Sequence, residues 1–439
     1  MKKITILFLF LANISFAQST YTIEGHFPNF PNSNYELKGY DGMQNTVIST
    51  AQSKEDGKFT LTYPATYIGA AQLYMNGAYQ NLFLLNKENI TIFWEDLTNR
   101  EGMQLTNSKE YDAFVVGMKT YQAAEAKLAG WNYLLPLYEK DTIQQKKIAE
   151  ELHIVNESFP SYVKSLPETI WVRQYLLSKG LIEQMPNSVK TYPWRAPQHV
   201  PEFMAIDFKL LKHAGLYKEL VEGYTYLVER FPLEEVAPLL NQAIDKVIVE
   251  LKDEPTIQQE IAQHWFTFLE SHSLFASAEY LALKMLNQDN CMLNQKSNDM
   301  FEQYRKLAIG KTAPNIELTK GKNLKNLKNT YKLVVFGASW CPNCKTDYSK
   351  LKDIYADLKE KYNLEIVYIS IDTDKAEFEK HYKDAPFITY CDTKGWETQA
   401  AKDYHVFATP TYLLLNKDLK IEAKINTPEH LEAWLKAKK

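Results

Sequence analysis

Two of the chain's four cysteines stand close together, as Cys341-Pro-Asn-Cys344 within the stretch FGASWCPNCKTDYSKL. This spacing suits a redox-active dithiol, half of a metal site, or a local disulfide that only tethers the backbone. Four cysteines in 439 residues are too few to build a scaffold held together by disulfides. The pair is therefore more typical of chemistry than of structural cross-linking.

The elements around the pair would make its first cysteine reactive. The stretch YKLVVFGAS is typical of a buried strand that ends at the motif, and a helix is expected from Cys341 to about Tyr362. Pro342 suits the first turn of that helix, because its missing N–H would have no partner there. Cys341 would then stand at the helix N-terminus, where unpaired N–H groups and the helix dipole favour a thiolate. Cys344, three residues on, faces the same side, so Cys341 is the expected attacking thiol and Cys344 the resolving thiol.

Two further features could complete a dithiol site. Asp347 lies one helical turn beyond Cys344 and either accepts its proton or is an ordinary solvated carboxylate, and the residues alone leave both interpretations open. The stretch FATPTYLLL places Pro410 at the start of a strand-like run, where proline is tolerated. A cis bond there would expose the backbone of Thr409 to a substrate strand.

Residues 308–439 resemble the thioredoxin fold and, within it, the exported thiol–disulfide oxidoreductases of the TlpA/ResA type. The likeness rests on the stretches VVFGASWCPNCK, LEIVYISID and ATPTYLLLNKDLKI. It implies a redox-active disulfide between Cys341 and Cys344, with Cys341 as the nucleophile, and it implies no cofactor. The residues that would bind the substrate, all bordering the dithiol, are Trp340, Pro342, Thr409 and the cis-proline Pro410.

The sequence departs from the family pattern at a few positions. In ResA-like members an acid stands three residues after the second cysteine, and Asp347 occupies that place with a side chain one methylene shorter than glutamate. Gly337 and Val335 stand where the family usually has Trp and Asn. These departures concern fine tuning of the site rather than its chemistry.

Other functions for the motif fit less well. A zinc site needs four ligands, and beyond the dithiol the nearest further candidates are Cys391 and His405, which form no closely spaced pair. A thiol peroxidase would need Thr two or three residues before its reactive cysteine, whereas Ser339-Trp340 precede Cys341. The competing hypothesis from another class is a non-catalytic thioredoxin-fold binding protein, in which the remaining modules carry the function.

The N-terminus indicates export. Residues 1–17, in MKKITILFLFLANISFAQ, combine two lysines, an apolar core too short to span a membrane, and small residues at the expected cleavage point. We therefore expect a signal peptide and a soluble mature protein in the periplasm or another extracytoplasmic space. The formal charge of −4 argues against nucleic-acid binding, which requires a basic face.

The composition changes along the chain in a way that predicts a multidomain protein. Residues 20–100 contain seven strand-like segments and predict a small antiparallel β-sandwich, with a hairpin at Asp56-Gly57. This zone resembles a β module of unknown function found in exported bacterial proteins. Residues 107–306 show helical periodicity, interrupted by the proline-rich stretch MPNSVKTYPWRAPQHVPEF, which predicts a loop. Residues 308–439 alternate strands and helices, as in an α/β thioredoxin fold.

Two cysteines fall outside the motif. Cys291 lies in an expected loop between helices, where we interpret it as an unpaired residue without a role. Cys391 ends a predicted strand, and a small buried side chain is the favoured interpretation over a regulatory one.

The expected function is that of an extracytoplasmic thiol–disulfide oxidoreductase in cell redox homeostasis. Lys345 is the one cation near the motif, offset by Asp347, which favours a reductase of protein disulfides over an oxidase or isomerase. Such a reductase needs partners: client proteins with disulfides, and a thiol-type electron donor in the membrane. The upstream zones would select the client or hold a homodimer.

Overall fold

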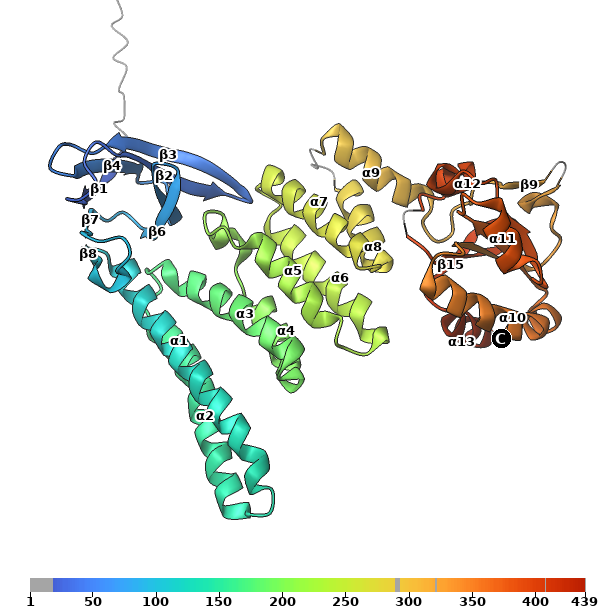
Figure 1. Cartoon of the computed structure of the whole chain (residues 1–439), viewed down its shortest axis with the longest axis horizontal. Helices are drawn as coiled ribbons and strands as arrows, with labels where there is room; N and C mark the ends of the chain where they lie inside the picture. The colour runs from blue at the N-terminus through green and yellow to red at the C-terminus, as the bar shows by residue number, and fades with distance from the viewer. Residues whose placement is uncertain (1–18, 289–292, 320–321, 407, 439) are drawn as a thin grey trace, which may run out of the picture. The chain divides into compact units, whose positions relative to one another are not determined.

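The computed structural model describes residues 19–288, 293–319, 322–406 and 408–438 (Figure 1). The expected signal peptide and Cys291 lie outside the described residues. The chain divides into two compact units, one up to Ile261 and one from Ala262 onward. The division falls inside helix α7 (Pro255–Ser271), so the last helices of the helical zone share a unit with the α/β zone.

The first unit begins with a β-sandwich, as predicted, but the prediction that its strands are antiparallel holds only in part. Its two four-stranded sheets have the orders β4-β1-β7-β8 and β3-β2-β5-β6, and the β1–β7 pair is parallel. Inward side chains alternate along the strands and form one aromatic-rich core. The strands are β1 (Thr20–His26), β2 (Asn34–Asp41), β3 (Gln44–Gln52), β4 (Lys58–Pro64), β5 (Gly69–Met75), β6 (Ala78–Leu85), β7 (Ile90–Phe93) and β8 (Gln104–Thr106).

The predicted hairpin at Asp56-Gly57 is wrong. The turn itself is present: Lys54 N–H donates to the Lys58 carbonyl at 2.8 Å, and Gly57 has a φ of +76°. However, β3 pairs with β2 while β4 pairs with β1, so the turn joins the two sheets instead of two paired strands. A turn motif in the sequence indicates only that the chain changes direction there. Which strands then pair depends on how each strand packs in the folded protein.

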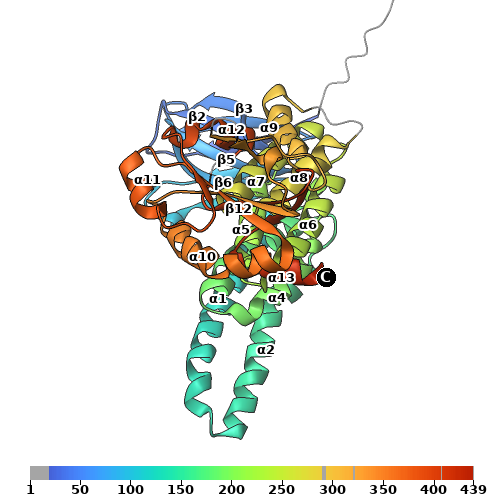
Figure 2. The same ribbon diagram turned by 90° about the vertical axis from the view of Figure 1, so that its right-hand side faces the viewer.

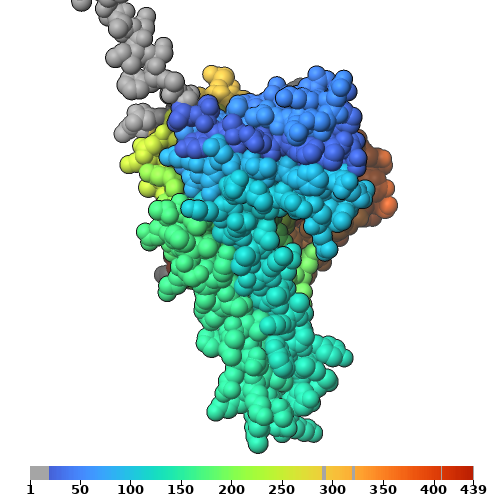
Figure 3. Space-filling view, turned by 90° about the vertical axis from the view of Figure 1, so that its left-hand side faces the viewer, coloured from blue at the N-terminus to red at the C-terminus, as the bar shows by residue number. Residues whose placement is uncertain are grey.

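Helices make up the rest of the first unit, beginning with a long antiparallel hairpin of α1 and α2 (Figure 1), whose residues form a narrow lobe in the space-filling view (Figure 3). The proline-rich stretch lies largely in helices, so the predicted loop is wrong. Pro186 stands inside α3 because Met185 and Leu181 bury the surrounding turns, and Pro197 lies in the first turn of α4, where its missing N–H needs no partner. The helices are α1 (Lys109–Leu134), α2 (Thr142–Ser165), α3 (Val172–Lys190), α4 (Ala196–Met204), α5 (Tyr217–Val228) and α6 (Leu233–Glu250).

The second unit contains the α/β fold expected from the alternating pattern. Its five-stranded sheet has the order β13-β12-β11-β14-β15, in which β11 pairs parallel with β12 and antiparallel with β14. The strands of this sheet are β11 (Tyr331–Gly337), β12 (Leu364–Ser370), β13 (Ile388–Tyr390), β14 (Thr411–Asn416) and β15 (Ile421–Ile425). Two short strands, β9 (Glu317–Thr319) and β10 (Lys322–Asn323), form a separate two-stranded sheet. The helices after α7 are α8 (Phe275–Leu286), α9 (Gln295–Lys306), α10 (Pro342–Tyr362), α11 (Lys375–Tyr382), α12 (Gln399–Asp403) and α13 (Pro428–Ala437).

Both faces of this sheet are covered, which is why the central strand is almost continuously apolar (Figure 2). Leu351 and Tyr355 of α10 and Leu431 of α13 pack on one face. Ala401 of α12 and Tyr404 pack on the other. The covered sheet fixes β11 in place, so the turn that follows it holds the motif at one defined point.

The helices that follow Ala262 attach to this α/β fold through polar contacts. Glu279 of α8 forms an ion pair with Lys424 of β15, and the Lys424 ammonium lies 5.2 Å from the centre of the Tyr304 ring of α9. Tyr304 also donates a 2.5 Å hydrogen bond to Glu270 of α7, and burial raises the pKa of that carboxyl to about 7. These three helical segments therefore belong to the α/β unit.

A tight approach inside the sheet explains one departure from the family pattern. A Cβ added at Gly337 would lie 2.0 Å from the hydroxyl oxygen of Tyr368, whose ring is fully buried beneath the end of β11. The Tyr368 hydroxyl is itself 3.3 Å from that of Tyr382. Glycine at 337 thus makes room for a tyrosine on the neighbouring strand.

We expect Gly337→Ala to destabilise the protein by about 1–3 kcal/mol, because the buried Tyr368 ring has little room to move. Denaturant unfolding of the full-length protein measures this change. Tyr368→Phe removes the clashing hydroxyl. Gly337→Ala should therefore cost less stability in the Tyr368→Phe background than in the wild type. Additive effects of the two substitutions would contradict this explanation.

Candidate functional site

The dithiol lies where the central strand passes into helix α10. Cys341 is the N-cap of that helix, with extended backbone angles, and its sulfur accepts a hydrogen bond from the Cys344 N–H at 3.2 Å. Pro342 follows at the first helical position. The sulfur of Cys341 thus occupies the position in which N-cap side chains accept from free backbone N–H groups, and a thiolate there is stabilised by charge-assisted hydrogen bonding.

The structure pairs Cys341 with Cys344 in a disulfide, with Cα atoms 5.2 Å apart. Both residues are largely buried, but Cys341 retains 5% of its exposure and Cys344 only 1%. Cys341 is therefore the more accessible residue of the pair, and its role as the attacking thiol stays a prediction.

The predicted substrate-binding residues gather around Cys341. Trp340 is 56% exposed, Pro342 is exposed, and Thr409 and Pro410 are half-buried. The Thr409–Pro410 bond is cis, and the Thr409 carbonyl oxygen lies 3.5 Å from the Cys341 sulfur. An extended segment of another protein that paired with this backbone would bring its own sulfur to Cys341.

A buried carboxylate, which the sequence analysis missed, holds the turn between β11 and α10. The Ser339 N–H donates to both oxygens of Asp372 at 3.1 Å, and the Ser339 hydroxyl donates to Oδ1 at 2.8 Å. The Ser370 hydroxyl donates to Oδ2 at 2.6 Å. Hydrogen bonds to a charged group each contribute roughly 1.5–3 kcal/mol, so this network anchors the residue two positions before Cys341. The only available signal was the polar pair Ser370 and Asp372 at the end of a buried strand.

Asp347 is less exposed than a solvated carboxylate would be. Its side chain is 15% exposed, and the Tyr412 hydroxyl donates a 2.6 Å hydrogen bond to it. The ammonium of Lys350 lies 4.0 Å away and pairs more closely with Glu429, at 2.7 Å. Burial, together with this hydrogen bond, raises the pKa of Tyr412 above its usual range, so the phenol remains a donor to Asp347. The role of Asp347 as proton acceptor for Cys344 stays a prediction.

Cys391 has a structural environment. Its thiol donates to the Asp372 carbonyl and its sulfur accepts from the Thr393 N–H, both at 3.4 Å. Burial raises the pKa of this half-buried thiol, which opposes thiolate formation. His405 lies elsewhere, with its ring centre 6.0 Å from that of Tyr304. Among the described residues no group of three metal-binding side chains comes together.

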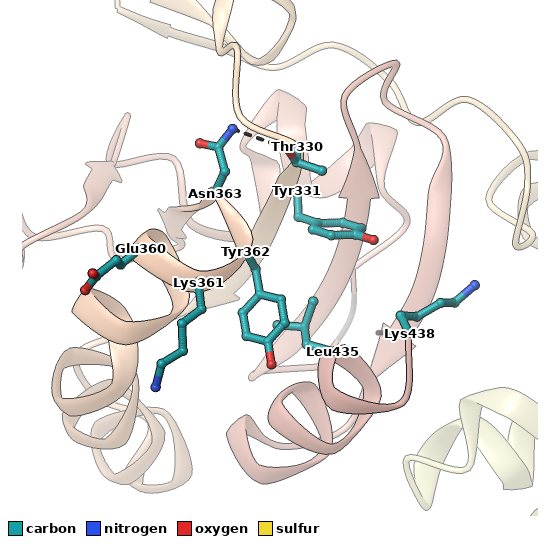
Figure 4. Close-up of a pocket in the computed structure, with 8 residues that line it drawn as sticks. All are labelled: Thr330, Tyr331, Glu360, Lys361, Tyr362, Asn363, Leu435 and Lys438. Carbon is teal, nitrogen blue, oxygen red and sulfur yellow. Dashed lines mark hydrogen bonds between the residues drawn. The ribbon is translucent and has the colours of Figure 1, made fainter.

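A hollow of about 370 Å³ lies at the opposite end of β11, away from the dithiol (Figure 4). It is bordered by Tyr331 at the start of the strand and by Tyr362 at the end of α10. Asn363 caps this helix in a left-handed conformation and donates to the Thr330 hydroxyl at 3.2 Å. These contacts close the helix end, and none of the predicted site residues lies there.

Comparison with known proteins matches both ends of the chain. Residues 329–421 match a thioredoxin-like family, and residues 21–114 match a domain of unknown function (DUF4369). The thiol–disulfide oxidoreductase ResA of Bacillus cereus is 35% identical over 146 residues, which span 31% of this chain and 82% of ResA. The chain belongs to the ResA family of thiol–disulfide oxidoreductases.

Further relatives match part of this ResA-family protein. The tryparedoxin of Trypanosoma brucei brucei is 30% identical over 84 residues, spanning 19% of this chain and 58% of the relative. A solved thiol–disulfide oxidoreductase from Bacteroides fragilis is 31% identical, covering 29% of this chain and all of that one, with a TM-score of 0.27. No helix within the described residues is both long enough and apolar enough to cross a membrane.

In the reduced ResA-type domain we expect Cys341 to be alkylated quickly near neutral pH and Cys344 slowly. The Cys341 sulfur accepts the Cys344 N–H at the start of the helix, and Cys341 is the more accessible residue of the two. Timed iodoacetamide labelling with mass spectrometry measures both rates, and Cys344→Ser should retain the fast labelling. Equal and slow labelling of the two thiols would contradict the assignment.

We expect Asp347→Asn to slow disulfide exchange by roughly 10²-fold, because general-base assistance is typically worth that much or more. The matched control is Tyr412→Phe, which removes the hydrogen bond to Asp347 but keeps the carboxylate. Stopped-flow exchange rates of both variants distinguish catalysis from packing. A rate for Asp347→Asn within twofold of the wild type would reduce Asp347 to a structural carboxylate.

Proposed function

We propose that this protein reduces disulfides of client proteins outside the cytoplasm. The observation that carries the proposal is the dithiol at the N-terminus of α10, with the more accessible sulfur beside the Thr409 carbonyl. Membership of the ResA family supports the same chemistry. No cofactor enters the reaction, since the two sulfurs carry both electrons.

The proposed reaction has two exchange steps. The Cys341 thiolate attacks one sulfur of the client disulfide, forming a mixed disulfide and releasing the other client sulfur as a thiolate, which takes up a proton. Cys344 then loses its proton and attacks the Cys341 sulfur, releasing the second client thiolate. The client gains two electrons and two protons, and the protein ends as the Cys341–Cys344 disulfide seen in the structure.

The surroundings of Cys341 support binding of an extended client. Trp340 and Pro342 are exposed next to Cys341 in the chain, and the Thr409 carbonyl, which precedes Pro410, lies 3.5 Å from the Cys341 sulfur. We propose that the client strand lies along the Thr409 backbone, as expected for an edge that offers free peptide groups. Asp347, held by Tyr412, would take the proton of Cys344 in the second step.

The charges near the motif favour reduction over oxidation. An oxidising dithiol has a strongly stabilised thiolate, which requires positive potential around the attacking sulfur. Here Lys345 is exposed, whereas the carboxylate of Asp372 is buried and hydrogen-bonded to Ser339, two residues before Cys341. Asp347 adds a second carboxylate within the first turns of the helix. Both carboxylates disfavour a stable thiolate, so the disulfide form is favoured and the dithiol is a reductant.

The cellular setting follows from the same chemistry. An extracytoplasmic space is oxidising, so the protein must be re-reduced after each turnover. We propose a thiol-type electron donor in the membrane, which attacks the Cys341–Cys344 disulfide by the reverse of the steps above. The N-terminal sandwich and the helices would select clients or hold a homodimer.

We expect a reduction potential nearer to the thioredoxin value of about −270 mV than to the DsbA value of about −120 mV. Equilibration of the full-length protein against glutathione buffers, followed by thiol trapping, measures it. A disulfide that is almost fully reduced at a poise of about −180 to −210 mV would overturn the reductase assignment.

A further inference from the structure

A second tryptophan, Trp396, stands beside the tryptophan that precedes the dithiol. The Trp396 side chain is 41% exposed and that of Trp340 is 56% exposed, with ring centres 6.5 Å apart and ring planes inclined by 57°. Large aromatic side chains at this exposure leave much apolar surface in water, which marks interaction sites when it lies in one patch. Trp396 comes from the loop after β13, so two separate segments supply the pair.

The loop that carries Trp396 is built to hold it there. The Asp392 carboxylate accepts from the Lys394 N–H at 3.1 Å and from the buried Thr398 hydroxyl at 2.6 Å. Thr393 and Gly395 both have positive φ angles, and a Cβ added at Gly395 would lie 3.0 Å from the Thr373 side chain. Such backbone angles are unfavourable and persist only where the surrounding contacts stabilise them. The loop therefore presents Trp396 in a fixed place rather than leaving it on a free chain.

A hollow of about 220 Å³ lies next to the tryptophan pair, on the side of Trp340. Lys345 and His381 border it, and its three acidic residues are Asp372, Asp374 and Glu377. Asp374 caps α11 through the Ala376 and Glu377 N–H groups, with its side chain exposed. Glu377 pairs with Lys380 at 3.2 Å and with His381 at 3.5 Å. The border carries three carboxylates and Lys345, and Lys380 pairs with one of these carboxylates, Glu377, so one negative charge remains in excess and favours a cation.

We propose that Trp396, Trp340 and this hollow form a subsite for an arginine or lysine side chain next to the reactive cysteine of the client. The long apolar stem would lie against the two indole rings, whose faces attract cations. The charged end would then reach the Asp374 and Glu377 carboxylates. The inference rests on the proposed function and adds to it the class of client: a disulfide with a basic neighbour.

The subsite also orders the client relative to the sulfur. Trp340 directly precedes Cys341 in the chain, and Lys345 lies in the first turns of helix α10, which begins after Cys341. A basic side chain held by the tryptophans would therefore fix the adjacent client cysteine near the attacking sulfur. A second contact, in addition to the Thr409 backbone, orients the client better than one contact alone.

The test uses pre-reduced full-length protein and disulfide-bonded peptides that differ only in the residue next to cysteine, which is Arg, Leu or Glu. Each rate is divided by the rate of the same peptide with dithiothreitol, which removes the effect of the neighbour on intrinsic reactivity. We expect the normalised rate for the Arg peptide to exceed that for the Glu peptide by about tenfold. Trp396→Ala should reduce this preference about fivefold, the range expected from losing a cation–π contact and its apolar surface.

Two variants separate charge from folding. Asp374→Asn keeps a good helix cap but removes a negative charge, so it should lower the preference for the Arg peptide without unfolding α11. Trp396→Phe keeps an aromatic face and should retain most of the preference. The matched control is Trp194→Ala, at a tryptophan that is 61% exposed in the first unit, which should leave the preference unchanged.

The outcomes are distinguishable. Equal normalised rates for the three peptides would overturn the subsite while leaving the reductase intact. A preference that survives both Trp396→Ala and Asp374→Asn would also overturn it. A wild-type protein that reduces none of the peptides would overturn the proposed function and this inference with it.

Discussion

The hydrogen bonds of one buried carboxylate, Asp372, fix the turn that places the dithiol. Strand β11 is buried on both faces and ends at Gly337, so the turn that follows has to direct the chain sharply into α10. Asp372 binds the backbone and hydroxyl of Ser339 in that turn, and it lies just after β12, the parallel neighbour of β11. A buried carboxylate is costly unless it is fully hydrogen-bonded, so this turn has one favourable geometry. That geometry places Cys341 at the start of the helix.

The same carboxylate connects the placement of the dithiol to its proposed chemistry. In the proposed mechanism, a negative charge behind the turn would oppose the thiolate that the helix N-terminus favours, and the balance of the two would set the tendency to give up electrons. Asp372 also links the dithiol to the loop that carries Trp396, because its carbonyl accepts from Cys391, whose sulfur accepts from Thr393. Cys391 thus connects two segments of the site through its hydrogen bonds.

Local sequence patterns predicted a large part of this architecture. Alternation of strands and helices indicated the α/β fold, and short β-rich segments indicated the sandwich, since both patterns reflect which faces are buried. The errors arose where long-range packing decides. The turn at Asp56-Gly57 joins two sheets instead of forming a hairpin. Pro186 and Pro201 lie inside helices, because burial of their neighbours outweighs the lost hydrogen bonds.

The sequence by itself determined the parts of the site that depend on short spacing. Cys341 and Cys344 are three residues apart in a first helical turn, so their disulfide requires no other element. Only the tertiary structure decided which groups surround them: Asp372 reaches Ser339 across 33 residues of chain, and Tyr412 reaches Asp347 across 65. Trp396 joins Trp340 from another loop. Contacts between such distant residues depend on strand order and register, which cannot be derived from one short segment of sequence. Helical spacing, in contrast, follows directly from 3.6 residues per turn.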